Sequence, residues 1–413
     1  MSIALVPVAS PLHDPQILKE IMTKVVDLVS RINKDIVIYN VLTQINDVNR
    51  VSRDHSLLIV PVLTGGTEHI IYKLTTLGLP IALIAHKSSN SLAAALEVKA
   101  KLMYEGYPAE LFLLGSGIKD HLEAFIKASE TYKELKKLKV LLIGDPSPWL
   151  IYSSLNLRKY EEVLGIKIVK VSIDEILSTI NEVDESEFQN VLESLLGVKT
   201  IEPKRNDLLN SLRLYIAIKK LALRYNSKLI TIRCFDLISH GVTACLPLSL
   251  LNDEGIVAGC EGDIPAALTM YILSKLSGKP TFMGNIVWVE DKDILLAHCT
   301  VALKLVGSFI FRSHFESGIG LSIEGYPIKG LIITIARLDM NRDELRVSIG
   351  RIMNTEPLLK NRACRTQFLI RFEGNPKYVI NESIGNHYVI AVGDVRKSLK
   401  YLALMLKLKY IEF

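Results

Sequence analysis

The most informative segment of the chain is Gly255–Leu268, with the sequence GIVAGCEGDIPAAL. Its first half is a short apolar run typical of a buried β-strand, and its second half, from Ile264, is typical of a helix. Two acids, Glu261 and Asp263, stand at the turn between them. Open α/β sheets bind ligands at the carboxyl ends of their strands. A carboxylate at this turn is therefore placed where a binding site is expected.

The same alternation of strand and helix runs through the first two thirds of the chain. Apolar residues recur at spacings of three and four in stretches such as Gln16–Ile32 and Leu92–Tyr104. This pattern predicts parallel βαβ units in doubly wound sheets. The expected strands are Ile3–Val8, Ile36–Val41, Leu57–Val62, Ile81–Ala85, Leu111–Leu114, Val140–Ile143, Ile166–Val171, Val198–Ile201, Leu229–Ile232 and Ile256–Ala258.

The pattern changes after about residue 278, where strand-like runs follow one another with short polar turns. This predicts a mainly antiparallel sheet or barrel. The expected strands are Thr281–Val289, Ile294–Val301, Phe309–Phe315, Leu331–Ala336, Leu345–Ile352, Phe368–Phe372 and Tyr388–Val392, followed by an amphipathic helix, Val395–Leu408. With a charged segment marking the first boundary, we predict three domains, 1–136, 137–277 and 278–413.

The composition limits the possible partners and the compartment. The chain has 413 residues, 49% of them hydrophobic, a formal net charge of +5 and five cysteines. The sequence shows no apolar run of transmembrane length, no cleavable leader and no dense basic stripe. We therefore expect neither a membrane nor a nucleic acid as partner. An odd number of cysteines without a CxxC pair predicts reduced thiols in a cytoplasmic protein.

Two histidines in the predicted strands, His298 and His387, could join Glu261 in binding one divalent metal ion, because carboxylate and imidazole groups suit such an ion. Each residue alone has a simpler explanation. A lone histidine in a strand is more often a packed core residue. An acid in the first helical turn, such as Asp263, complements the helix dipole, and Pro265 agrees with a helix start there.

Other polar groups follow predicted strands. Arg233 and Asp236 could hydrogen-bond a polyol, and the alternative is an ion pair that holds their loop. His314 and Glu316 are two residues apart, so in a strand they would share one face. The two prolines in Asp145–Trp149 predict a rigid turn with a structural role.

Together these motifs resemble the L-fucose/L-arabinose isomerase family, and most of all its shorter fucose isomerase-like branch found in archaea. The resemblance covers most of the chain. The motifs that carry it are Cys260–Asp263, Phe282–Asn285, Leu296–Thr300, Ser313–Gly318, Thr334–Arg337, Gly385–His387 and Gly393–Asp394. It implies two Rossmann-like doubly wound parallel-sheet domains followed by a β-barrel domain, in agreement with the periodicity.

The resemblance also implies an aldose–ketose isomerase that binds Mn²⁺ or a similar divalent ion and transfers a proton through a cis-enediol. It makes Glu261 a metal ligand and the base, with His387 and His298 as further ligands. We add Asp263 as a second candidate for proton transfer. The candidate substrate-binding residues are Arg233, Asp236, His314, Glu316 and Asn386.

One position departs from the family pattern. Its isomerases have a second acid where this chain has Asn285, which can offer an amide oxygen to the metal but cannot act as a base at neutral pH. Asp263, Glu316 or a metal-bound water could replace that acid. Two alternatives to the isomerase therefore stay open: a carbohydrate-binding protein without catalysis, and another metal-assisted sugar enzyme such as an epimerase or lyase.

Members of this family form trimers or hexamers whose sites are completed by a neighbour's first domain. On that analogy we expect a homo-oligomer that acts on a small sugar. Gly65–His69 or His86–Asn90 would then face the metal site of an adjacent subunit.

Overall fold

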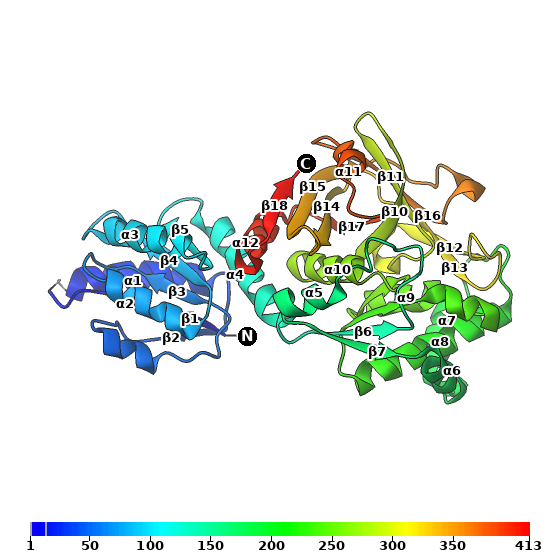
Figure 1. Ribbon diagram of the computed structural model, residues 1–413, viewed down its shortest axis with the longest axis horizontal. Helices are drawn as coiled ribbons and strands as arrows, with labels where there is room; N and C mark the ends of the chain where they lie inside the picture. Colours follow the sequence, from blue (N-terminus) through cyan, green and yellow to red (C-terminus); the bar gives the residue numbers. More distant parts are fainter. Residues whose placement is uncertain (1, 13–14) are drawn as a thin grey trace. The chain divides into compact units, whose positions relative to one another are not determined.

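A computed structural model of the chain (Figure 1) describes residues 2–12 and 15–413. The chain divides into two compact units: unit 1 is Met1–Glu134 with Lys397–Leu408, and unit 2 is Leu135–Arg396 with Lys409–Phe413. Lys397–Leu408, most of the expected terminal helix, is part of unit 1, and residue 277 lies inside unit 2. The expected division into three domains stays a prediction.

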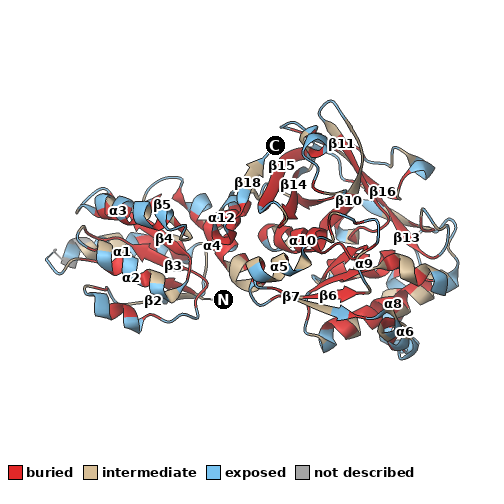
Figure 2. Ribbon diagram, viewed as in Figure 1, coloured by how far each residue is buried: buried red, intermediate tan, exposed pale blue. Residues whose placement is uncertain are grey.

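Unit 1 contains a five-stranded parallel sheet in the order β2-β1-β3-β4-β5. Its strands are β1 (Ile3–Leu5), β2 (Ile36–Ile38), β3 (Leu58–Pro61), β4 (Ile81–Ala85) and β5 (Ala109–Leu113). Its helices are α1 (Pro15–Ser30), α2 (Glu68–Leu74), α3 (Ser91–Tyr104), α4 (Ile118–Leu135) and α12 (Arg396–Leu406). Every residue of β3 and β4 is buried, as expected when helices cover both faces of a parallel sheet. Figure 2 shows these strands as a buried layer.

Unit 2 begins with a second parallel sheet, in the order β7-β6-β8-β9. Its strands are β6 (Lys139–Ile143), β7 (Lys167–Val171), β8 (Leu229–Ile232) and β9 (Val257–Cys260). The helices are α5 (Leu157–Leu164), α6 (Ile173–Asn181), α7 (Gln189–Leu195), α8 (Arg205–Arg224), α9 (Cys245–Asp253) and α10 (Ile264–Ser277). From β6 the chain continues to β7 on one side, and then to β8 and β9 on the other side, so the strand order reverses between β6 and β8. Ligands are expected at the carboxyl ends of the two strands at such a reversal.

The remaining strands of unit 2 form a closed barrel in the order β14-β17-β10-β11-β16-β15, closed by β14 pairing with β15. They are β10 (Thr281–Glu290), β11 (Asp293–His298), β14 (Ile332–Asp339), β15 (Glu344–Ile352), β16 (Thr366–Phe372) and β17 (His387–Val392). All of these pairs are antiparallel. The predicted fold class, two doubly wound parallel sheets followed by an antiparallel barrel, is confirmed.

Several predicted strands differ in detail. Val198–Ile201 is not a strand, because it meets a neighbour only through one bridge between Thr200 and Phe311. Two strands were not expected: β13 (Ser322–Tyr326), which pairs with β12 (Ser308–Arg312) outside the barrel, and β18 (Lys409–Glu412), which adds in parallel to β15. The run predicted as Phe309–Phe315 ends at Arg312. His314 and Glu316 therefore lie in a turn and do not share a strand face.

The helix α10 connects the second parallel sheet to the barrel and fixes the position of the turn before it. Every residue from Ile264 to Leu273 is buried, so this helix is apolar on all sides. It packs on β8 and β9 of the parallel sheet and on β10, β14 and β17 of the barrel. The turn between β9 and α10 is therefore held next to the barrel strands.

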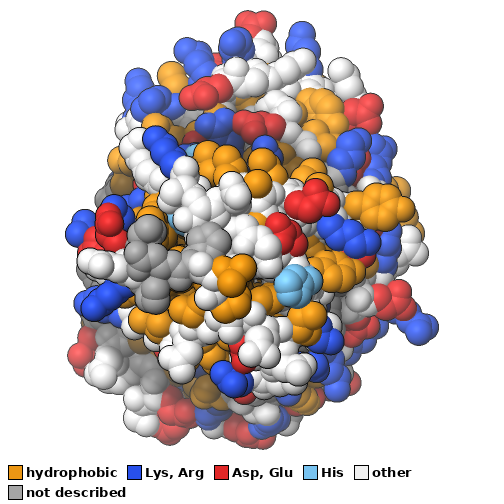
Figure 3. Space-filling view, turned by 90° about the vertical axis from the view of Figure 1, so that its left-hand side faces the viewer, with side chains coloured by type: hydrophobic (Ala, Val, Ile, Leu, Met, Phe, Trp, Pro, Cys, Tyr) orange, Lys and Arg blue, Asp and Glu red, His pale blue; other side chains and the backbone are white. Residues whose placement is uncertain are grey.

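The structure describes the helices, the surface charge and the cysteines on which the composition analysis rests. None of the helices in the described part of the chain has the length and hydropathy that crossing a membrane requires. On the face drawn in Figure 3, acidic and basic side chains of the described residues are interspersed. All five cysteines are free thiols, and four of them are buried. The cytoplasmic location inferred from them stays a prediction.

Candidate metal centre

The turn after β9 fixes the direction of the Glu261 carboxylate. Glu261 has a left-handed backbone conformation, with φ of +62°, which is unusual for a residue with a side chain. The backbone N–H of Ser147 donates to its carbonyl oxygen at 2.9 Å and holds this conformation. The next residue, Gly262, has no room for a side chain, since a Cβ there would lie 2.8 Å from the carbonyl oxygen of Asp145.

Glu261 faces two histidines from the barrel. His298 ends β11 and His387 begins β17, and β10 lies between these two strands. The Nε2 atoms of His387 and His298 lie 3.6 Å and 3.8 Å from Oε1 of Glu261. The three side chains are buried, and one possible ligand atom of each lies within 4.8 Å of the others. The structure therefore brings together the three residues that the sequence offered as metal ligands.

His298 shows the clearest sign that the group suits a metal ion. Neither of its ring nitrogens has a hydrogen-bond partner in the part of the chain that the structure describes. Burial, opposed by Glu261 and reinforced by His387, lowers the pKa of His298 to about 4, so its ring is neutral at physiological pH. A buried polar atom without a partner is costly. A neutral imidazole with a free lone pair is what a divalent ion requires of a histidine ligand.

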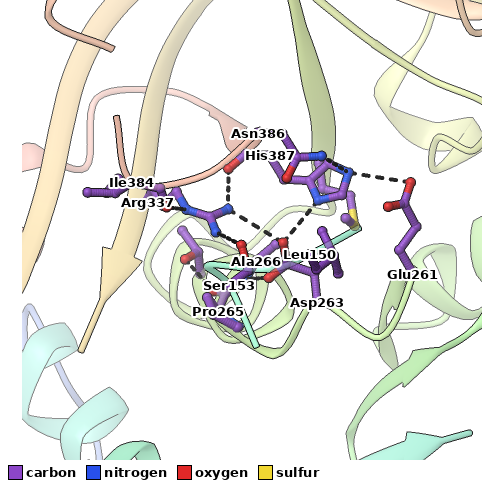
Figure 4. A network of polar contacts seen from close by, with 12 residues as sticks. Leu150, Ser153, Glu261, Asp263, Pro265, Ala266, Arg337, Ile384, Asn386 and His387 are labelled. Carbon is purple, nitrogen blue, oxygen red and sulfur yellow. Dashed lines mark hydrogen bonds and ion pairs between the residues drawn. The ribbon is translucent and has the colours of Figure 1, made fainter. Parts of the chain in front are cut away.

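His387 is oriented by a buried carboxylate behind it (Figure 4). Its Nδ1 makes a 3.0 Å hydrogen bond with Oδ2 of Asp263, and the guanidinium of Arg337 lies 3.6 Å from the same oxygen. Arg337 also donates to the carbonyl oxygen of His387 and, at 2.7 Å, to the hydroxyl of Ser153. These contacts turn Nε2 of His387 toward Glu261, as a carboxylate behind a metal-binding histidine does.

The pKa shifts follow from these contacts. Burial alone would lower the pKa of His387, but its hydrogen bond with Asp263 and its contact with Glu261 raise it to about 9. Burial would raise the pKa of Glu261, but the contact with His387 and its charge outweigh burial and bring the value to about 2. For Asp263, Arg337 and His387 outweigh burial in the same way, and its pKa is also about 2. Without a metal ion, negative and positive groups therefore alternate along this buried network.

Asp263 has both of its oxygens engaged. Oδ1 accepts from the backbone N–H of Ala266 at 2.8 Å and caps α10, while Oδ2 contacts His387 and Arg337. Asp263 therefore caps the start of α10, as the sequence suggested, and also contacts His387. Asp263 is 1% exposed.

A cavity of about 490 Å³ adjoins the metal centre. Glu261 lines it together with three other residues expected at the site, Asn285, Glu316 and Asn386. Aromatic side chains, among them Trp149 and Phe235, form further parts of its wall. Apolar walls with a few converging polar groups are typical of small-molecule sites.

Three of the expected substrate-binding residues do not line this cavity. Arg233 and Asp236 form an ion pair with each other at 3.0 Å, which is the alternative that the sequence left open. His314 packs edge-on against Phe235, with the ring centroids 5.5 Å apart. Its Nδ1 makes a 3.0 Å hydrogen bond with the hydroxyl of Ser317.

Trp149 was not among the candidates from the sequence, because the nearby Pro146 and Pro148 predict a turn with a structural role. The Nε1–H of Trp149 donates to Oε2 of Glu261 at 2.6 Å. Its ring packs edge-on against Phe235, with the ring centroids 4.8 Å apart. Trp149 follows β6 and Phe235 follows β8, the two strands at which the chain order reverses. The rule that ligands bind at this edge was the signal that could have identified both residues.

Comparisons with known proteins relate the chain to sugar isomerases. No protein-family model matches it. A protein named "Sulfoquinovose isomerase" from Alkalicoccus urumqiensis is 22% identical over 340 residues, which cover 78% of this chain and 76% of that protein. A protein of the same name from Clostridium sp. (strain MSTE9) is 23% identical over 70% of this chain and 67% of its own length. Another from Priestia aryabhattai is 23% identical over 71% of this chain and 68% of its own length.

These relatives support the predicted enzyme class, a sugar isomerase, but they do not single out the fucose/arabinose branch. A solved structure titled "Crystal structure of putative two-component system response regulator/ggdef domain protein" aligns with 56% of this chain and 81% of its own at a TM-score of 0.23 and 11% identity. A likeness this weak carries no argument about fold or function.

Replacing Trp149 tests whether its indole prepares Glu261 for a metal ion. Trp149→Phe keeps an aromatic ring against Phe235 but removes the donor to Oε2 of Glu261. We expect the Mn²⁺ dissociation constant, measured by isothermal titration calorimetry, to rise about 10- to 100-fold, the usual effect of removing a group that orients a ligand. Trp288→Phe, the same change at the chain's other tryptophan, is the control. Equal affinities of both variants and the wild type would contradict the role of Trp149.

Proposed function

We propose that this chain is a metal-dependent aldose–ketose isomerase. The observation that carries the proposal is the buried group of Glu261, His298 and His387, turned toward one another beside a cavity with polar and aromatic walls. The relatives named as isomerases support the reaction class.

In this proposal Oε1 of Glu261 and the Nε2 atoms of His298 and His387 hold one divalent ion, with Mn²⁺ as the expected metal. When bound, such an ion acts as a Lewis acid toward the oxygen atoms of a sugar. The amide of Asn285 is a further candidate ligand, because Asn285 is paired in register with His387 and lines the same cavity. Its oxygen accepts from the side chain of Asn386 at 2.7 Å, so this hydrogen bond would have to be shared or broken.

The protein's own side chains divide the remaining work. Trp149 holds Oε2 of Glu261 and leaves Oε1 directed at the two imidazoles. Asp263 orients His387, and because both of its oxygens are engaged we assign it this role in place of proton transfer. Asn386 and Glu316 lie on the cavity wall, where they can contact sugar hydroxyls.

The substrate in this proposal is a sugar whose carbonyl end lies at the metal centre. The cavity wall includes the cation Arg362 as well as neutral amides. Sulfoquinovose, the sugar in the relatives' name, therefore belongs in a test panel beside neutral pentoses, hexoses and deoxyhexoses.

Asn285 keeps a second candidate function open. An amide at this position removes one negative charge and one proton acceptor from the site. A carbohydrate-binding protein without catalysis, or an epimerase or lyase, would accommodate that loss.

Turnover separates these candidates. Metal-stripped protein reloaded with Mn²⁺ is expected to interconvert at least one aldose–ketose pair of the panel and, in D₂O, to incorporate deuterium into the product, as followed by NMR. Glu261→Gln is expected to lose at least 10²-fold in kcat/KM, because it removes a charged metal ligand. Bound metal without conversion or exchange of any sugar would contradict the isomerase, and a product other than the isomer would indicate the epimerase or lyase.

We also propose that the chain forms a homo-oligomer. A second cavity of about 530 Å³ shares Trp149 and Asn386 with the metal-centre cavity and is lined by Ile151 and Ile380, which are 78% and 59% exposed. Exposed apolar residues of this kind are typical of surfaces that contact another protein. That the segments Gly65–His69 and His86–Asn90 face a neighbour stays a prediction.

Sedimentation velocity tests the oligomer. We expect a species larger than the 46.1 kDa monomer, and Ile151→Asp is expected to shift it toward the monomer, because a buried unpaired charge disfavours the contact. A wild-type protein that sediments only as a monomer at micromolar concentration would contradict this proposal.

A further inference from the structure

The cavity beside the metal centre needs a proton acceptor that its most obvious acids do not supply. Moving a hydrogen between two neighbouring carbons requires a group with a free lone pair that lies on the wall and can reach a C–H bond. Glu261 has Oε2 held by Trp149 and Oε1 turned to two imidazoles. Asp263 caps a helix and holds His387, and it does not line the cavity.

The remaining groups on the wall are also poor acceptors, with one exception. Asn285 and Asn386 are amides bonded to each other, and Arg362 is a permanent cation. Cys364 is close to Cys299, and that contact together with burial raises the pKa of its thiol, so it stays protonated. The exception is Glu316.

Glu316 lies on the cavity wall, where its side chain is exposed and its carboxylate has no partner among the described residues. No hydrogen bond or ion pair joins this side chain to any of the residues that the structure describes. Its backbone is held in a turn by the bond from the N–H of Gly318 to the carbonyl oxygen of His314, at 2.9 Å. Although the side chain is exposed, partial desolvation at the cavity wall, and then the charge of Glu261, raise the pKa of Glu316 above its ordinary value. A carboxylate with a raised pKa is a stronger base than an ordinary one.

We infer that Glu316 is the carboxylate that removes and returns the substrate proton, in place of the acid that this chain lacks at Asn285. The inference rests on the proposed function and adds a catalytic residue to it. Glu316 comes from the turn after β12, outside the barrel strands that carry the histidines.

The step balances without any further reactant. Glu316 takes the proton from C2 of the aldose, the C2–H electron pair forms the C1=C2 bond, and the carbonyl pair moves to O1, which gives an enediolate. The hydroxyl proton passes from O2 to O1. As the C2=O2 carbonyl forms, the electron pair of the C1=C2 bond takes the proton back from Glu316 at C1, and the carboxylate is restored.

Glu316→Gln tests the inference in the Mn²⁺-loaded full chain with a sugar that the wild type converts. We expect kcat to fall about 10²- to 10⁴-fold, as for removal of a general base, with KM within about threefold of the wild type. Deuterium exchange at C2 in D₂O is expected to disappear in parallel with turnover. Mn²⁺ affinity is expected to stay within about twofold, because Glu316 is not one of the proposed ligands. Glu290→Gln, the same change at an exposed residue of β10, is the control and is expected to match the wild type.

The possible results separate the roles of Glu316. A raised KM with kcat unchanged would show that Glu316 only binds substrate. A loss of Mn²⁺ affinity would show that Glu316 supports the metal ion. Either result overturns the inference. Glu316→Asp keeps a carboxylate and is expected to be at least tenfold faster than Glu316→Gln, and equal rates would also overturn it. If the Mn²⁺-loaded wild type converts no sugar, the proposed function itself fails. An active wild type with an equally active Glu316→Gln variant contradicts this inference alone.

Discussion

The contact between Asp263 and His387 is the interaction on which the rest of the site depends. Asp263 belongs to the turn after β9, and His387 belongs to the barrel strand β17. One oxygen of this carboxylate starts α10 and the other orients the imidazole, so the same side chain fixes the helix and the metal centre. Removing one partner of such a buried pair would leave an uncompensated charge, which typically costs about 3–5 kcal/mol.

Charge balance explains why these groups can be buried together. Glu261 and Asp263 are ionised and carry negative charges. Arg337 is positive, and His387 is also positive because its pKa is raised. The four groups therefore alternate in sign and sum to zero. A metal ion at Nε2 of His387 would displace a proton from that nitrogen, and the positive charge facing Glu261 would be kept. The same network thus suits both the metal-free and the metal-bound protein.

The sequence predicted the parts of the fold and site that depend on local pattern. Periodicity identified both parallel sheets and the barrel, because buried parallel strands and alternating antiparallel strands differ in apolar spacing. The position of Glu261 followed from one strand-to-helix turn, and the pairing of Glu261 with His298 and His387 came from the ordered motifs. The hydrogen bond from Trp149 to Glu261 could not be predicted from local pattern, because it joins loops after two strands that are far apart in the sequence. The strand predicted through His314 was wrong because the chain leaves the strand after Arg312 and turns at Phe315–Ser317, in an otherwise strand-like pattern.

Every functional role proposed above depends on Glu261, His298 and His387 holding one divalent ion. The most direct test is a crystal structure of the full chain grown with Mn²⁺, with data collected on both sides of the manganese absorption edge. We expect one anomalous peak per chain, with Oε1 of Glu261 and the Nε2 atoms of His298 and His387 at about 2.0–2.3 Å, the usual range for such ligands. A peak elsewhere, or no peak at these three residues under conditions that saturate the protein with Mn²⁺, would contradict it.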